Sequence, residues 1–122
     1  MATNDDLGRI ALALPEAEQT PGDPLFTVRG KQFVWTWRER VHPKKTKVPR
    51  PDVLAVRVPD LPDKGALIAS DPEAFFTEPH YDGYAVVLVR LPVVGVDALT
   101  EVVTDSYRCV APPGLVQELA AD

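Results

Sequence analysis

The sequence predicts an α+β fold, with helices packed on a mainly antiparallel five-stranded sheet. The most apolar run, residues 85–89, is short, rich in β-branched side chains and closed off by Pro92, as in a strand. The links between apolar segments are mostly hairpin-like, which favours antiparallel neighbours. Helical periodicity near both ends and once in the middle gives the order helix, three strands, helix, two strands and two helices.

The chain is expected to begin with a helix. Thr3 or Asn4 can cap its first turn, acidic residues follow, and Pro15 stands after its last periodic position. The apolar positions that share one helical face are Leu7, Ile10, Ala11 and Leu14. Residues 16–24, with three acids, two prolines and a glycine, predict a loop.

Residues 25–38 predict a hairpin whose turn is Gly30-Lys31. Alternation along the returning strand places Phe33, Trp35 and Trp37 on one face. Aromatic residues at this spacing usually belong to the core side of a strand. A stacking role toward a nucleic-acid base stays open for Trp37, which lies nearest to the basic segment that follows.

The second half of the chain is predicted in the same way. A strand over 52–58 ends at Pro59, and a helix capped by Asp60 follows. Residues 75–78 and 84–91 predict two strands around a turn. After them come a helix opened by Asp97 and, beyond Pro112-Pro113, a last short helix. Because the strand at 84–91 is apolar on both faces, it is expected to be an inner strand of a covered sheet.

Composition indicates one domain, residues 1–122, that buries a core without disulfides or metals. Hydrophobic residues make up 45% and charged residues 25%, as in ordinary globular proteins. No apolar run approaches the roughly 20 residues that span a bilayer, and the acidic N-terminus does not resemble a secretory signal. With a single cysteine as well, we expect a cytoplasmic protein without a membrane partner.

Charge is distributed unevenly along the chain. The net charge is −5, yet residues 38–50, called here the cationic segment, carry +5, and the remainder carries −10. The basic residues of the segment are Arg38, Arg40, Lys44, Lys45, Lys47 and Arg50. They predict either a wing that binds nucleic-acid phosphates or a solvated loop that pairs with the acidic surface.

Four stretches together resemble the MmcQ/YjbR-like family. They are LALPEAEQT, PLFTVRGKQFVWTW, SDPEAFFTEPHYDGYAVVLVRL and DALTEVVTDSYRCVAPPGLVQEL, and PHYDGY followed by VLVRL is the most specific part. The resemblance covers nearly the whole chain. It implies an α+β fold similar to that of frataxin (CyaY-like) and of secretion chaperones. It also implies a proposed role in DNA binding through two β wings, and it offers no catalytic residues.

Other candidate sites have simpler interpretations. His80, Tyr81, Asp82 and Tyr84 look like an acid–base cluster, but Asp82-Gly83 favours a turn. His42 and Cys109 lack zinc-ligand spacing, and Cys109 is expected to be a partly buried core residue. Acidic residues that could bind iron are more simply helix-start and loop charges. These residues are Asp5, Asp6, Glu16, Glu18 and Asp23.

These observations favour a small non-enzymatic binding protein that needs no cofactor and no metal. DNA, contacted by the cationic segment, is the leading candidate partner. The alternative is a protein-interaction or chaperone-like adaptor, in which a sheet face without helices is covered by a partner or a second copy. We expect a monomer or a weak homodimer.

Overall fold

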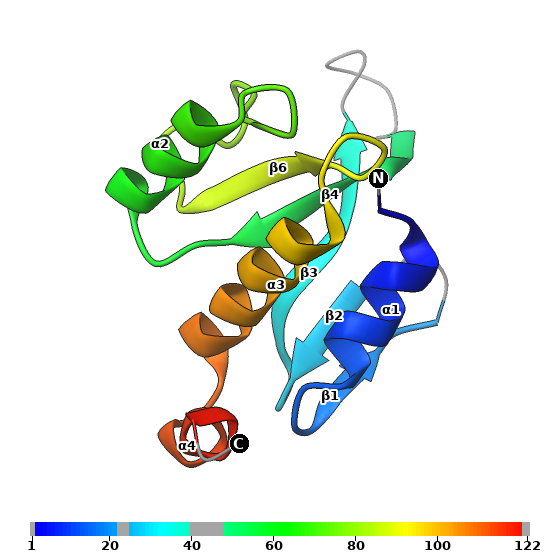
Figure 1. The fold of residues 1–122 in the computed structure, drawn as a ribbon, viewed down its shortest axis with the longest axis vertical. Coiled ribbons are helices and arrows are strands. Elements are labelled where there is room, and N and C mark those ends of the chain that lie inside the picture. Colours follow the sequence, from blue (N-terminus) through cyan, green and yellow to red (C-terminus); the bar gives the residue numbers. More distant parts are fainter. Residues whose placement is uncertain (1, 22–24, 40–47, 121–122) are drawn as a thin grey trace.

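The computed structural model describes residues 2–21, 25–39 and 48–120, and these residues form four helices and six strands (Figure 1). The elements are α1 (Asn4–Leu12), β1 (Ala17–Gln19), β2 (Leu25–Val28), β3 (Lys31–Glu39), β4 (Val48–Arg57), α2 (Leu61–Ser70), β5 (Phe75–Phe76), β6 (Val86–Arg90), α3 (Val96–Val110) and α4 (Pro113–Ala120). One sheet has the order β1-β2-β3-β4-β6-β5, with each neighbouring pair antiparallel. The predicted α+β class is confirmed. Within the described ranges, no helix has the length and apolar character needed to span a membrane.

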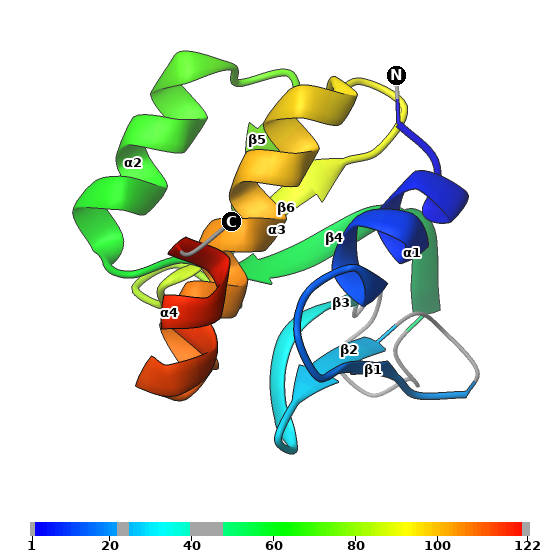
Figure 2. The same cartoon turned by 60° about the horizontal axis from the view of Figure 1, so that its bottom comes forward.

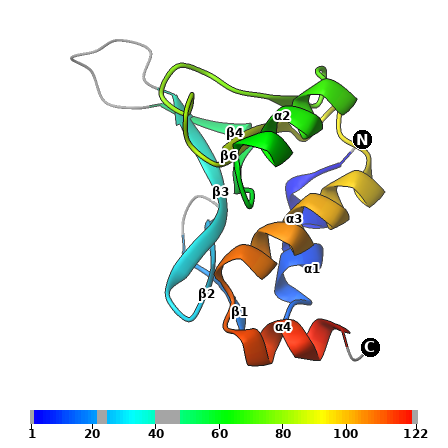
Figure 3. The ribbon, with the colours of Figure 1, turned by 90° about the vertical axis from the view of Figure 1, so that its left-hand side faces the viewer.

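The helices α1, α2 and α3 lie on one side of the sheet, which Figure 3 shows nearly edge-on. The main core fills the space between them and the sheet. Strand β6 lies between β4 and β5, and its residues 86–89 are buried on both faces. The prediction of a covered inner strand is therefore confirmed, and the apolar run at 85–89 is the reason for it.

Helix α3 is attached to distant parts of the chain by two buried polar residues. The Ser106 hydroxyl donates to the carbonyl of Phe33 at 2.6 Å, and the Tyr107 hydroxyl donates to that of Pro15 at 2.8 Å. The rings of Phe33 and Tyr107 meet edge to face at 5.8 Å between centroids. Burial raises the pKa of Tyr107, so its hydroxyl stays a hydrogen-bond donor at neutral pH.

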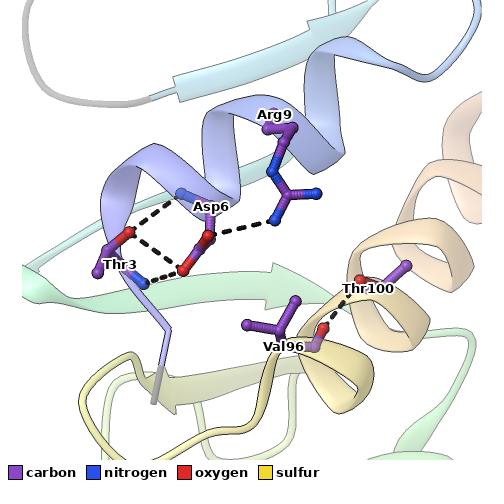
Figure 4. A network of polar contacts seen from close by, with 5 residues as sticks. All are labelled: Thr3, Asp6, Arg9, Val96 and Thr100. Carbon is purple, nitrogen blue, oxygen red and sulfur yellow. Dashed lines mark hydrogen bonds and ion pairs between the residues drawn. The ribbon is translucent and has the colours of Figure 1, made fainter.

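Helix α1 begins with a complete capping box at Thr3, one of the two predicted caps (Figure 4). The Thr3 hydroxyl accepts from the Asp6 amide at 3.1 Å, and the Asp6 carboxylate accepts from the Thr3 amide at 3.0 Å. Arg9 donates to the same carboxylate and, with the Thr3 amide, lowers the pKa of Asp6. Helix α3 starts differently: Gly95 offers no side-chain cap, and Thr100 donates to the Val96 carbonyl at 2.8 Å.

The sheet has six strands where five were predicted, because β1 lies in the predicted loop 16–24. Its sequence, Ala-Glu-Gln, has no apolar alternation that would indicate a strand. Glu16 and Arg29 flank the same end of the β1–β2 pair, next to Ala17 and Val28, and form a two-fold ion pair with both N–O distances at 2.9 Å. The hairpin turn is also one residue earlier than predicted: Arg29 and Gly30 both have positive φ, 52° and 81°.

The predicted common face of Phe33, Trp35 and Trp37 is wrong for Phe33. Phe26 pairs with Val34 and Thr27 pairs with Gln32, so Phe33 is an extra residue in a β-bulge. As a result, Phe33 and Val34 both join the main core, while the two tryptophans lie on the opposite side of the sheet.

Candidate nucleic-acid interface

Strands β3 and β4 extend past the strands on both sides of them. Strand β2 pairs with β3 only as far as Trp35, and β6 pairs with β4 only from Val53 onward. Beyond these limits, residues 37–39 pair with residues 48–50 alone, and we call these six residues the β3–β4 ribbon. A register shift between Thr36 and Trp37 separates the ribbon from the rest of the sheet. The ribbon therefore projects as a two-stranded wing.

The six basic residues of the cationic segment are divided between the ribbon and residues that the structure does not describe. Arg38 lies in β3 and Arg50 in β4. Arg40, Lys44, Lys45 and Lys47 lie outside the described residues. Arg50 is paired across the ribbon with Glu39, at 2.6 Å from Nη2 and 2.7 Å from Nε to the same carboxylate oxygen. Glu39, the one acidic residue of the cationic segment, thus neutralises the charge of Arg50.

The side of the sheet opposite the helices is covered by aromatic side chains, and we call it the helix-free face. Its buried floor consists of Ala55, Val86 and Leu88. Four half-buried aromatic residues pack over this floor, namely Trp35, Trp37, Phe76 and Tyr81. The adaptor hypothesis expected a partner to cover a face without helices, but here the chain's own aromatic residues cover much of it.

Specific contacts order these aromatic side chains. The rings of Trp37 and Phe76 meet edge to face at 5.9 Å, and the Trp35 indole N–H donates to the Tyr81 hydroxyl at 3.4 Å. The Arg90 guanidinium lies 3.8 Å from the centroid of Phe76, and that of Arg57 lies 5.4 Å from Trp35. Trp37 is the aromatic residue that belongs to the ribbon.

Arg57 and Arg90 were not singled out from the sequence, although a signal was present. Each arginine is the last residue of a strand in which alternate residues face the helix-free side. Ala55 lies two residues before Arg57, and Leu88 lies two residues before Arg90. Period-two alternation therefore places both arginines at the border of this face.

The predicted turn at His80–Gly83 is confirmed. The side chains of His80 and Asp82 make contacts within the turn or just before it. The Thr77 hydroxyl donates to the Asp82 carboxylate at 3.2 Å, the His80 ring packs on Tyr81, and Gly83 has a φ of 86°. Buried Lys64 of α2 holds the turn by donating to the carbonyls of Tyr81 at 2.6 Å and Tyr84 at 3.0 Å. Desolvation lowers the pKa of Lys64.

The structure describes Cys109 and most of the acidic candidates for a metal site. Within the described ranges, no three or more His, Cys, Asp or Glu side chains are arranged to hold an ion. Asp6 completes the α1 cap, Glu16 pairs with Arg29, and Asp23 lies outside the described residues. Cys109 is exposed, so its predicted place in the core is wrong. It lies two turns after Val102 on the same side of α3, next to the end of the helix at Val110.

Comparison with known proteins agrees with this description. The model of the YjbR family matches residues 12–109. Two proteins described as uncharacterised, from Mycobacterium bovis and Mycobacterium tuberculosis, are 41% identical over 129 residues, covering the whole chain and 98% of each relative. The crystal structure of Deinococcus radiodurans protein DR2400, with a DUF419 domain, has a TM-score of 0.67 at 22% identity. The match covers 98% of this chain and 89% of that one, which shows the same fold.

The family model spans most of the chain, and it includes the ribbon, the helix-free face and the His80–Gly83 turn. The chain therefore belongs to the YjbR family.

Proposed function

We propose that this protein is a non-enzymatic DNA-binding module that contacts the duplex backbone through its cationic segment. The observation that carries the proposal is the β3–β4 ribbon, which projects beyond the sheet and whose two strands are joined in the sequence by Arg40, Lys44, Lys45 and Lys47. A projecting two-stranded ribbon with cations at its end can reach phosphates while the bulk of the domain stays away from them.

The distribution of charge supports this mode of contact. Outside the cationic segment the chain carries −10, and this acidic surface is repelled by a polyanion. An orientation that presents the cationic segment is therefore the electrostatically favourable one. Arg90, at the border of the helix-free face beside Val53, adds a further cation near the base of the ribbon.

The proposal predicts a specific dependence on salt. Lysine and arginine release condensed counterions when they neutralise phosphates, so affinity falls linearly with salt on logarithmic axes. If all six basic residues meet phosphates, the slope for duplex DNA is about −5. The measurement is fluorescence anisotropy of a short labelled duplex, titrated with protein at several concentrations of NaCl.

The decisive variant is Lys44→Ala/Lys45→Ala/Lys47→Ala, which is expected to abolish binding at low salt. A matched control removes the same charge elsewhere, by Arg9→Gln/Lys31→Gln/Arg108→Gln, and is expected to keep most of the affinity. Equal losses in the two triple variants, or unchanged binding after removal of the three lysines, would exclude the cationic segment as the DNA contact.

A further inference from the structure

Two adjoining cavities form a continuous groove between α2 and α3, the helices that Figure 2 shows beside each other. One cavity, of about 420 Å³, lies between the two helices, and the other, of about 740 Å³, continues past the C-terminal half of α3. Both are lined by Val58, Pro59, Asp63 and Asp105. We call the two together the α2–α3 groove.

The part of the groove between the helices has an apolar floor. Its apolar lining residues are Val58, Pro59, Ala66, Leu67, Phe75, Ala98 and Val102. Helix α2 contributes Ala66, which is exposed, and Leu67, which is half-buried. Lys64 is the only residue of α2 that is fully buried, whereas α3 buries five residues. Helix α2 therefore keeps part of its apolar side uncovered along the groove.

Carboxylates surround this floor. Asp63 comes from α2, and Glu101 and Asp105 come from α3; all three are exposed, and this cavity has no Lys or Arg among its described lining residues. Asp105 is paired with Arg108 at 2.8 Å. The wall of this smaller cavity is thus acidic above an apolar base, which favours an occupant that is apolar on one side and cationic beside it. The larger cavity is lined by Arg57 and Arg108 as well as by Asp63 and Asp105.

We propose that the α2–α3 groove binds a basic amphipathic helix of a partner protein. Helix α2 has ten residues and is about 15 Å long, so about three turns of a partner helix fit beside it. Apolar side chains one turn apart enter the groove, and flanking Lys or Arg side chains meet Asp63 and Glu101. The smaller cavity lies on the helical side of the sheet, and the larger one reaches Arg57 and Val86 of the helix-free face. Neither cavity is lined by the β3–β4 ribbon, so the peptide contact is separate from the proposed DNA contact.

The test uses two synthetic helical peptides with the same leucine spacing, one with lysines and the other with glutamates at the flanking positions. Fluorescence anisotropy is expected to show binding of the lysine peptide only. Asp63→Asn/Glu101→Gln should weaken it by about 2- to 10-fold, since exposed ion pairs are individually weak. Glu18→Gln/Glu73→Gln, which removes the same charge elsewhere, should leave the affinity unchanged.

A steric pair of variants tests the position of the peptide. Ala66→Trp places a large side chain in the groove and should abolish binding. Ala69→Trp makes the same change at another exposed position of α2, which does not line the groove, and should have no effect. Both sites are exposed, so both variants should fold. Equal affinities of these variants, or equal binding of the two peptides, would overturn the proposal.

Cys109 supplies an independent readout, because it is the only cysteine in the sequence and lines the larger cavity. Desolvation, and then the charge of Asp105, raises the pKa of its thiol, so its reaction with a chromogenic disulfide reagent is best followed at mildly alkaline pH. Bound lysine peptide should slow this reaction; an unchanged rate at saturation contradicts the proposal.

Sedimentation that shows a dimer abolished by Ala66→Trp would instead assign the groove to a second copy.

Discussion

Lys64 connects α2 to the most specific stretch of the sequence, the PHYDGY turn. Its ammonium group is buried and donates to the carbonyls of Tyr81 and Tyr84, while the charges of Asp82 and Glu78 partly offset the cost of desolvation. A lysine in a helix is ordinarily exposed, so its role could not be inferred from the sequence. It depends on residues 17 and 20 positions away that only the fold brings close.

Replacing this lysine is expected to destabilise the protein. Lys64→Met keeps the length of the side chain but leaves two carbonyls without their donor, at a cost of about 1–3 kcal/mol in the free energy of unfolding. Chemical denaturation measures that loss. Hydrogen exchange should also become faster in residues 78–84. Lys31→Met, at an exposed position, serves as the control and should change neither quantity.

The pH dependence of stability distinguishes this role from simple packing. Because the folded pKa of Lys64 is lowered, the unfolded state binds more protons between that pKa and 10.5, and stability from this group rises with pH there. Tyr107 has a raised pKa, so its contribution to stability falls as the pH rises above 10. This contribution is the same in the wild type and in Lys64→Met. The difference between wild type and Lys64→Met therefore isolates the lysine. A difference that does not change with alkaline pH would argue against a buried ammonium.

Among the elements, the β2–β3 hairpin shows how turn chemistry and bulges escape sequence analysis. The hairpin itself was predicted from two apolar runs around Gly30, and it is present. Its turn uses Arg29 in the left-handed region, a conformation that a long side chain seldom adopts and that the sequence does not announce. The bulge at Phe33 likewise has no local signal in the sequence; it accompanies packing of the Phe33 ring against Tyr107 of the distant helix α3.

A substitution at Arg29 compares two local contributions to stability: the backbone conformation of the turn and the ion pair with Glu16. Arg29→Asn supplies the Asn-Gly pair that suits a turn with two positive φ values, but it removes the ion pair with Glu16. Both partners are about half exposed, so the pair contributes little, and we expect the melting temperature to rise slightly. Glu16→Gln, which breaks the pair without changing the turn, should have almost no effect. A lower melting temperature for Arg29→Asn would show that the ion pair dominates.

For the whole molecule, the sequence predicted the fold class and the covered inner strand, because both follow from long-range patterns of apolar residues. It also predicted a helix-start cap at Thr3 or Asn4, of which Thr3 is used, and the turn at His80–Gly83. It did not predict β1, the arginines that border the helix-free face, or the exposure of Cys109, because pairing and packing decide these. The cationic segment was recognised from charge alone, and its role in DNA binding stays a prediction.

The uneven charge has a measurable result for the intact protein. The isoelectric point is near 5.0, so the protein is negatively charged at neutral pH. If its net charge alone decided binding, heparin would repel it. We expect it to be retained at low salt and eluted by NaCl, because the cationic segment acts locally. The Lys44→Ala/Lys45→Ala/Lys47→Ala variant should pass through the column. Passage of the wild-type protein would mean that the segment is not accessible to a polyanion.

The two outermost strands, β1 and β5, have only three and two residues. Exposed strand edges are where separate molecules join their sheets and begin to aggregate, and short edges limit such joining. A neighbouring molecule thus meets little unpaired backbone at these two outermost strands, although β6, just inside β5, is the most apolar strand of the chain. Short outermost strands therefore limit edge-to-edge association next to β6, the strand whose apolar side chains would favour it most.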